Sequence, residues 1–530
     1  MTRPAQFLIS ILQLCAVGGA LVFRASAQSP PETNPTFYIR EYRVEGAKKL
    51  SRLEVERAVY PFLGPERGVD DVEQARAALE KAYHTQGFQT VAVSVPQQDP
   101  RRGIIRLQVL ENKVGRLRVR GANYFLPSQI KREVPSLEEG QLPNLKQVST
   151  EMVGLNRLAD RRVTPSLLSG AEPGTVDIDL TVEDALPLHG SLELNNRYST
   201  GTTELRLNGG LTYANFFQKG HTGGISFQIA PEKLADAQVY SAFYLARISN
   251  GTSLMLSGTK QDSDISTLGG ASVGGRGTVL GLRAMYDLPT TAKFYQNFSI
   301  GIDYKSFEED IVLGPDTISS PIEYYPLSAN YGATWLAEKA FTEMNHSLTI
   351  GLRGIGSGVG DYSRKRFNSD GNFIYLRSDV AHTRDLKGGA QLFGKLQGQI
   401  SNRPLINNDQ FAGGGLGSAR GYLEATSLGD NAIFSTFEYR SASFIGNPGP
   451  TNPKSDEWRI HAFADAGWMG IWDAPPDQDA RFGFASTGLG TRIRLKDHYN
   501  GSLDIAMPLV TRPDATAGDI RITFRGWADF

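Results

Sequence analysis

The chain has 530 residues, of which 40% are hydrophobic and 21% are charged. This mixture excludes a disordered chain and a membrane protein built of apolar helices, and the length suits several domains, of which one could be a large barrel. Lys and Arg number 55 and Asp and Glu number 56, so the formal charge of −1 gives no electrostatic reason to expect nucleic acid as the main partner. The 57 glycines predict many tight turns.

Residues 1–27 have the pattern of a secretory signal peptide. Arg3 supplies the positive end, Phe7–Phe23 is an apolar run, and Ala-Ser-Ala at 25–27 forms a small-x-small cleavage site. The alternative is an uncleaved membrane anchor, for which the run is at the short end of the roughly 17–25 residues that span a bilayer. Cleavage would remove Cys15, the single cysteine, and would exclude disulfides, thiol catalysis and cysteine metal sites in the mature chain.

A short linker, 28–36, leads to two similar small units at 37–113 and 114–186. In each unit the pattern predicts the order strand, helix, helix, strand, strand. The stretch beginning at Leu117 matches the one beginning at Tyr42 with an offset of 75 residues, and the closing strands match with an offset of 73. We therefore predict a tandem repeat, with two unrelated α/β domains as the alternative.

The first unit illustrates the prediction. Phe37–Val44 is expected to form one strand, a helix then ends at Pro61, and a second helix begins with Asp70 or Asp71 as its N-cap. Because polar residues alternate along the closing strands of both units, one face of each sheet is expected to meet water. Small domains with exposed sheet edges suit the binding of an extended peptide by strand addition. A hairpin is predicted from the ranges 91–95 and 104–110.

From residue 187 to residue 530 the pattern predicts strands and no helices. Short segments alternate apolar with polar residues and are separated by Gly, Asn, Asp and Pro. Their length suits tilted membrane-spanning strands of roughly 9–11 residues. The predicted fold is thus a transmembrane β-barrel of about 16 antiparallel strands, preceded by two small α/β domains. The predicted strands start near residues 189, 203, 220, 237, 252, 274, 295, 320, 345, 371, 388, 432, 457, 481, 499 and 519.

The last of these strands shows why a barrel is preferred. One face would carry Ile520, Ile522, Phe524, Ala528 and Phe530, and the other Arg521, Thr523, Arg525 and Asp529. A soluble sandwich would bury the apolar face against a second sheet, whereas a barrel would turn it to lipid. The export signal, the absence of cysteine from the mature chain and the aromatic residue at the end of the strand favour lipid.

A long glycine-rich connection, 402–430, lies between the eleventh and twelfth predicted strands. It contains Gly413–Gly415 and then Arg-Gly-Tyr at 420–422, and dense glycines let a loop fold back on itself. The thirteenth strand places Asp465 on its charged face, which should be the lumen. A loop folded into the lumen could therefore set Arg420 against Asp465 as a bidentate pair. The plainer alternatives are an ordinary lumenal arginine and a merely flexible loop.

These motifs resemble those of a known family. The runs Gly-Gly-x-x-x-x-Arg-Gly-Tyr at 414–422 and Phe-x-Asp-x-Gly at 463–467 are similar to the inward loop and lumenal strand of outer-membrane transporters that combine POTRA domains with a barrel. Two units and sixteen strands resemble the two-partner secretion branch, of the haemolysin-activator and filamentous-haemagglutinin-exporter type. Weaker similarities are the stretch from Asn195 to Phe217 and Glu-Tyr-Arg at 438–440. The resemblance spans nearly all of 37–530.

Two features depart from the family pattern. Ala419 stands where the family usually has valine. Many members also carry an N-terminal helix that plugs the pore, and the range 28–36 is too short for such a helix and its linker. No helix plug is therefore expected here.

The resemblance implies roles for individual residues. The tip of the loop would be formed by Arg420, Gly421 and Tyr422. Asp465 would be the partner of Arg420, and Phe463 and Gly467 would shape its site. Glu438 and Arg440 would be further lumen-facing residues. Phe530 resembles the terminal assembly signal of bacterial outer-membrane barrels.

The implied function is export across the bacterial outer membrane. The periplasmic POTRA-like units would capture an unfolded partner exoprotein of the adhesin or cytolysin class, and its folding outside would drive transport without nucleotide hydrolysis. The lipid bilayer and the barrel assembly machinery would be the other partners. No cofactor, metal site or enzymatic activity is expected, because the seven histidines lie far apart and Gly356–Gly360 lacks the strand–turn–helix context of a nucleophile or phosphate loop.

Two other functions stay open from the sequence. An assembly factor that inserts other barrels or lipids would share the same architecture, although its relatives usually have more POTRA units. A passive porin-like channel would leave the two repeated units unexplained.

Overall fold

The computed structural model describes residues 36–530, except for 250, 264, 267–272, 275, 309, 314–315, 447–454 and 477. The predicted signal peptide at 1–27 and all of the predicted linker but Thr36 lie outside the described residues. The chain divides into two compact units. One comprises the chain up to Arg116 with Glu139–Val148 and Ser169–Asp177, and the other comprises Leu117–Glu138, Ser149–Leu168 and Ile178–Phe530.

The first repeated segment folds as two helices against a three-stranded sheet of order β2-β5-β4. Strand β2 is parallel to β5, and β4 is antiparallel to it, as the predicted hairpin requires. Tyr83, Leu79 and Leu107 are completely buried in the core between helices and sheet. The elements are β1 (Phe37–Ile39), β2 (Glu41–Glu45), α1 (Arg52–Val59), a 3-10 turn (Tyr60–Phe62), β3 (Gly64–Arg67), α2 (Val69–Thr85), β4 (Val91–Ser94), a 3-10 turn (Pro100–Arg102) and β5 (Ile104–Glu111).

Two local predictions for this segment are wrong. The single strand predicted at 37–44 is two strands, because the backbone N–H groups of Arg40 and Glu41 both bond to Gly103 O and β1 pairs with β3 instead of β5. The N-cap of α2 is Gly68, and neither Asp70 nor Asp71 takes that position. Asp71 is the third residue of the helix, and its carboxylate accepts the N–H of Gly68 at 2.9 Å.

The second repeated segment has the predicted order strand, helix, helix, strand, strand, lacks counterparts of β1 and β3, and has a sheet of order β6-β8-β7. Strand β8 alternates as predicted, with Ile178, Leu180 and Val182 buried. On its other face Asp179 bonds to Arg118 at 2.7 Å and to Arg120 at 2.9 Å. The elements are β6 (Lys113–Arg120), α3 (Pro127–Arg132), a 3-10 turn (Pro135–Leu137), α4 (Leu145–Leu155), β7 (Arg161–Ser169) and β8 (Thr175–Asp184).

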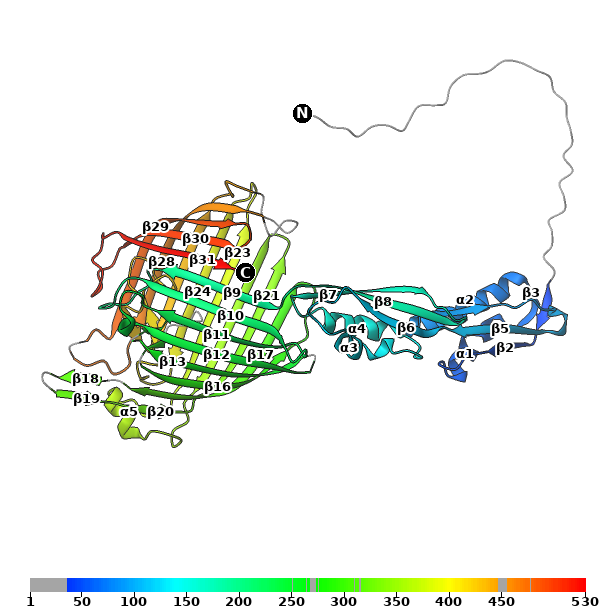
Figure 1. The fold of residues 1–530 in the computed structure, drawn as a ribbon, viewed down its shortest axis with the longest axis horizontal. Helices are drawn as coiled ribbons and strands as arrows, with labels where there is room; N and C mark the ends of the chain where they lie inside the picture. Colours follow the sequence, from blue (N-terminus) through cyan, green and yellow to red (C-terminus); the bar gives the residue numbers. More distant parts are fainter. Residues whose placement is uncertain are drawn as a thin grey trace, which may run out of the picture. The chain divides into compact units, whose positions relative to one another are not determined.

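The remaining strands close into an antiparallel barrel (Figure 1). Within the described residues there are sixteen strands if β20 and β21, which pair with the same strand β17, are counted as one. The predicted strand number and the barrel are therefore confirmed. The barrel consists of β9 (Leu188–Asn195), β10 (Arg206–Phe216), β11 (His221–Ile229), β12 (Gln238–Ser249), β13 (Thr252–Asp262), β16 (Arg276–Asp287), β17 (Phe294–Glu308), β20 (Ile322–Tyr324), β21 (Leu327–Ala337), β22 (Ala340–Ile350), β23 (Ile374–Asp385), β24 (Gln391–Ser401), β27 (Asn431–Arg440), β28 (Glu457–Gly470), β29 (Arg481–Leu495), β30 (Tyr499–Pro508) and β31 (Arg521–Asp529).

The two faces of the barrel wall differ in chemistry. In β31, Ile522 is 53% exposed on the outer face, whereas Arg525 on the inner face forms an ion pair with Glu193 at 2.7 Å. The outer face is apolar along most strands, as a lipid-facing wall requires. Exposed outward residues include Leu192, Leu194, Leu254, Leu256, Leu280, Leu282, Leu376, Leu396, Ile400, Ile433 and Leu489.

The connections carry small elements of their own. The prediction of no helix after residue 187 is wrong, because α5 (Val359–Lys365) lies between β22 and β23. Among the described residues, no helix is both long enough and apolar enough to cross a membrane. The remaining short strands form hairpins: β14 (Ile265–Ser266) with β15 (Val273–Gly274), β18 (Asp310–Leu313) with β19 (Asp316–Ser319), and β25 (Phe411–Gly413) with β26 (Ser427–Gly429).

Candidate functional site

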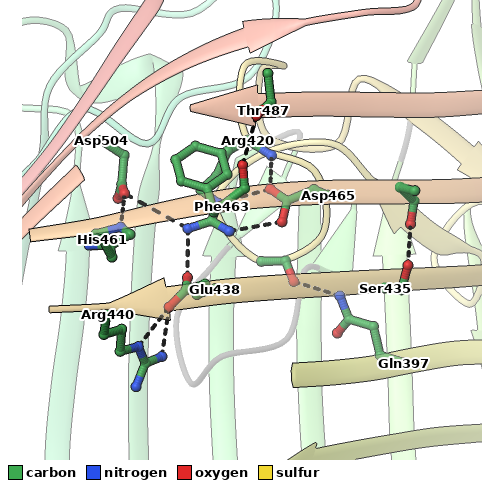
Figure 2. A network of polar contacts seen from close by, with 12 residues as sticks. Gln397, Arg420, Ser435, Glu438, Arg440, His461, Phe463, Asp465, Thr487 and Asp504 are labelled. Carbon is green, nitrogen blue, oxygen red and sulfur yellow. Dashed lines mark hydrogen bonds and ion pairs between the residues drawn. The ribbon is translucent and has the colours of Figure 1, made fainter. Parts of the chain in front are cut away.

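The loop between β24 and β27 meets inward-facing residues of the barrel wall. Its tip depends on glycine, because Gly414, Gly415 and Gly421 have φ of +104°, +84° and +90°, a region that other residues rarely adopt. Ser418 closes the turn, since its hydroxyl accepts Gly414 N–H at 2.8 Å and donates to Gly414 O at 3.0 Å. The turn directs Arg420 toward β28 (Figure 2).

Arg420 and Asp465 form the bidentate pair that the sequence suggested. The guanidinium donates from Nε to Oδ2 and from Nη2 to Oδ1, both at 2.8 Å, and the backbone N–H of Arg420 adds a third bond at 3.1 Å. Both side chains are buried, and the ring of Phe463 lies 3.5 Å from the guanidinium carbon. A fork-shaped ion pair stacked on an aromatic ring fixes the direction of the loop tip as well as its position.

Two more carboxylates surround the same guanidinium (Figure 2). Glu438 on β27 accepts from Arg420 Nη1 at 2.7 Å, and Asp504 on β30 lies 3.8 Å from the same nitrogen. Glu438 also binds Arg440 at 2.7 Å and Arg492 at 3.1 Å, so the predicted residue Arg440 meets Arg420 only through Glu438. These further arginines offset the negative charge that three carboxylates bring to one arginine.

Tyr422, Gly421 and Gly467 complete the fit of the loop to the wall. The hydroxyl of Tyr422 lies 2.7 Å from Val510 O and 3.0 Å from Ala485 O, either of which can accept its proton. A Cβ on Gly421 would lie 3.1 Å from Pro508, and one on Gly467 would lie 2.1 Å from the buried ring of Phe434. At Gly467 only glycine leaves room for the neighbouring ring, whereas at Gly421 the contact is tight and the φ of +90° favours glycine.

The part of the loop that follows the tip, 423–430, is also held in place, by residues that the sequence analysis did not identify. Glu424 binds Arg197 at 2.7 Å, and its backbone N–H donates to Tyr198 O at 3.0 Å. Asp514, in the connection between β30 and β31, accepts from Leu423 N–H at 3.0 Å and from the hydroxyl of Thr426 at 2.6 Å. Arg197 and Tyr198 lie in the stretch that resembles the family's first hairpin. That resemblance was the only feature of the sequence that pointed to these two residues.

Beside the loop, the lumen keeps a polar cavity of about 480 Å³. Its lining includes Asn345, Asp379 and Gln397 from the wall and Gly417 and Glu424 from the loop. The amide of Gln397 donates to the backbone carbonyl of Gly417 and ties loop to wall across the cavity. Amides and charges of both signs make this cavity a wet space instead of an apolar ligand pocket.

Two family models match the chain. One, described as a POTRA domain of ShlB type, matches residues 37–112. The other, described as haemolysin secretion/activation protein ShlB/FhaC/HecB, matches residues 174–493, which is more than half of the chain.

Similar curated proteins are outer membrane transporters. The outer membrane transporter CdiB of Dickeya dadantii (strain 3937) is 22% identical over 435 residues, covering 76% of this chain and 71% of that protein. The outer membrane transporter CdiB of Escherichia coli is 27% identical over 190 residues, which cover 35% of this chain and 32% of that protein.

Solved structures share the fold along almost the whole chain. CdiB from Escherichia coli has a TM-score of 0.63 at 19% identity, covering 96% of this chain and 93% of that one. BamA from Haemophilus ducreyi lacking POTRA domains 1–3 has a TM-score of 0.56 at 14% identity, covering 93% of this chain and 100% of that one.

Proposed function

We propose a specific export function for this chain, which belongs to the haemolysin secretion/activation protein family ShlB/FhaC/HecB and is therefore an outer-membrane transporter of the two-partner secretion type. Its barrel lies in the outer membrane and its POTRA domain in the periplasm. The specific proposal is that its partner is an unfolded exoprotein of the adhesin or cytolysin class. The folding of that exoprotein outside the cell would drive transport without nucleotide hydrolysis.

Capture of the exoprotein is assigned to the two small domains at 37–113 and 114–186. Each places a short strand at the edge of a three-stranded sheet, with β2 outermost in the first and β7 outermost in the second. An unpaired strand edge offers backbone N–H and C=O groups to an extended chain. An unfolded exoprotein is such a chain, so strand addition at these edges is the proposed first step.

The single observation that carries a dedicated mechanism is the anchoring of the loop at Arg420. A loop of 29 residues, 402–430, would lose much entropy on insertion into the lumen, and the buried Arg420–Asp465 pair stabilises the inserted position. We propose that Arg420, Gly421 and Tyr422 form the working tip, that Phe463, Asp465 and Gly467 form its seat, and that Glu438 and Arg440 support the seat.

Insertion of the barrel itself is assigned to the barrel assembly machinery. Phe530 supports this proposal because it follows the last strand, and its backbone N–H and C=O both bond to Gly190 on β9, at 3.0 and 2.9 Å. The last residue is thus part of the closure between the first and last strands.

The test is a comparison of secreted proteins from cells carrying the wild type, Arg420→Ala or a matched control, Arg283→Ala. Arg283 also faces the lumen and pairs with a carboxylate, Asp303 at 3.0 Å, but it lies outside the loop site. We expect Arg420→Ala to abolish release of one large extracellular protein while barrel amounts in the membrane stay unchanged. Normal release from Arg420→Ala would contradict the role of this residue.

The main alternative is an assembly factor, because the BamA structure shares the fold. The same experiment separates the two functions. An exporter variant leaves other outer-membrane proteins at normal levels, whereas an assembly factor variant lowers many of them together.

A further inference from the structure

A second buried cluster lies at the neck of the loop, away from Arg420. Its centre is the carboxylate of Asp430, which is 0% exposed. Five hydrogen bonds of 2.8–3.2 Å converge on it, from Arg366 Nη1 and Nη2, Leu405 N, Gln410 Nε2 and Trp472 N. A carboxylate this deeply buried is stable only while such donors surround it.

The donors come from three different connections of the barrel. Arg366 follows helix α5 between β22 and β23, and Trp472 follows β28. Leu405 and Gln410 lie in the first part of the loop 402–430, before its tip. Strand direction alternates around the barrel, and the chain enters β9 from the periplasmic side. These connections follow the ninth, eleventh and thirteenth strands, so all three lie at the outer end.

Arg366 binds all three connections at once. Besides its two bonds to Asp430, its guanidinium donates to Leu405 O and to Trp472 O, both at 2.9 Å, and its side chain is only 11% exposed. A planar guanidinium with four bonds in fixed directions holds its partners in one arrangement. A lysine could replace its charge but not this geometry.

An apolar cluster fills the space beside this ion pair. Tyr362 of α5 and Phe373 pack with Leu405 and Ile406 of the loop and with Tyr324 of β20. Lys305 on β17 adds a second tie to the loop, through Asp409 at 2.8 Å. We call the connections 351–373, 402–430 and 471–476 the outer cap. Its buried residues pack these connections against one another and against β17 and β20.

We propose that Arg366 and Asp430 form a latch that keeps the outer cap closed, and that a polypeptide leaves the barrel only when this latch opens. The role given to this latch in export rests on the proposed function. Arg366 and Asp430 act as positioning residues, because their bonds hold the connections together.

The test is the conductance of the purified full-length chain in planar lipid bilayers. The matched pair is Arg366→Met and Arg364→Met, since Arg364 lies two residues earlier but forms only an exposed pair with Asp361, its side chain being 64% exposed. This pair is largely but not fully buried, so breaking it should shift such an equilibrium by roughly 100-fold, less than most fully buried pairs would give. We therefore expect a large rise in open time for Arg366→Met and none for Arg364→Met. Wild-type conductance for Arg366→Met would overturn the latch.

A second variant guards against misfolding. Asp430→Asn keeps the size of the side chain and removes its charge. Its single carbonyl oxygen can accept from Leu405 N–H or from Trp472 N–H but not from both, because these two groups bond to different oxygens of Asp430. This variant should raise open time as Arg366→Met does, and Arg366→Lys should restore part of the closure. Folding of both variants is checked by the position of the unheated protein band on gels. If both variants are folded and have wild-type open times, the proposal is overturned.

The conductance result is independent of the proposed export function, because no exoprotein is present in the bilayer. If Arg420→Ala leaves secretion unchanged while Arg366→Met raises open time, only the export proposal fails. If Arg420→Ala stops secretion while Arg366→Met conducts like the wild type, only the latch fails.

Discussion

At the scale of single residues, the Arg420 site shows how bond number and distance rank three carboxylates. Asp465 accepts three bonds from Arg420, counting its backbone N–H, whereas Glu438 accepts one and Asp504 lies 3.8 Å away. Removing one partner of a buried ion pair costs about 3–5 kcal/mol, because it leaves the other charge without compensation. The fewer bonds a substitution removes, the smaller this cost should be.

This ranking gives a prediction for export. Asp465→Asn should reduce secretion most, Glu438→Gln less, and Asp504→Asn least, because these carboxylates make three bonds, one bond and no bond to Arg420. Each replacement keeps size but removes the charge and one acceptor oxygen. The measurement is the amount of exoprotein released per folded barrel, with the unheated gel band as the control for folding. A stronger defect for Asp504→Asn than for Asp465→Asn would contradict the ranking.

The sequence pointed to the pair and, through the family resemblance, to Phe463 and Glu438 beside it, but not to Asp504. Arg420 and Asp465 stand in motifs that the eye can match, whereas Asp504 reaches the site through register. His461, Gly490 and Asp504 are neighbours across β28, β29 and β30, and Gly490 has no side chain to separate the other two. His461 therefore meets Asp504 at 2.7 Å. Strand register depends on pairing along the whole sheet, so a single sequence does not reveal it.

At the scale of elements, turn residues explain why strands were predicted well and helices in connections were not. Gly, Asn and Pro mark many of the strand ends in the barrel, and every predicted strand start lies within five residues of an observed one. Helix α5 has only seven residues and no apolar stripe. It is held by tertiary contacts, with Asp361 accepting Gly358 N–H at 2.8 Å and Tyr362 buried in the outer cap.

The capping box of α1 gives a prediction about pH. Ser51 donates from its backbone N–H and its hydroxyl to the Glu54 carboxylate, at 2.9 and 2.7 Å, and these bonds lower the pKa of Glu54 from its ordinary value of 4.5. A lowered pKa in the folded state means that the stabilisation is present above pH 4.5 and is lost as pH falls through the lowered pKa.

We expect α1 to lose protection against hydrogen exchange as pH falls below 4.5, after correction for the intrinsic effect of pH on exchange. Glu54→Gln should show weaker protection at neutral pH and a flatter profile, because its amide does not titrate. Equal profiles for the wild type and Glu54→Gln would show that this carboxylate does not stabilise the helix.

At the scale of the whole molecule, closure of the barrel depends on its seam. The ladder between β31 and β9 has five paired positions, whereas β28 and β29 share fourteen. Other bonds extend the short ladder at both ends. Asn196 accepts Phe524 N–H at 2.7 Å and donates to Ile522 O at 2.9 Å, and Phe530 pairs with Gly190 beyond the other end.

The fold as a whole could be predicted because it depends on pattern and motif. The contacts that close the barrel between its first and last strands could not. Alternation of apolar and polar residues indicated a barrel, and the two motifs indicated the family, which the match over 174–493 confirms. The seam depends on bonds from Glu193 to Arg525 and from Asn196 to Ile522, and each bond joins residues more than 300 positions apart in the chain. No local pattern joins them. The signal peptide and the domain boundaries stay predictions.

The seam gives the last prediction, which concerns whether the barrel opens sideways during export. Parting β9 from β31 would expose unpaired backbone groups to lipid, and the Glu193–Arg525 ion pair would also break. We therefore expect the seam to stay closed.

Leu194 and Gly526 are register partners on the outer face, at a spacing of roughly 4.5–5.5 Å that a disulfide can bridge. A Leu194→Cys, Gly526→Cys disulfide should leave export at the level of a control pair, Leu254→Cys with Ala284→Cys, in the longer ladder of β13 and β16. Export that stops only on oxidation of the seam pair, and returns on reduction, would show that the seam opens.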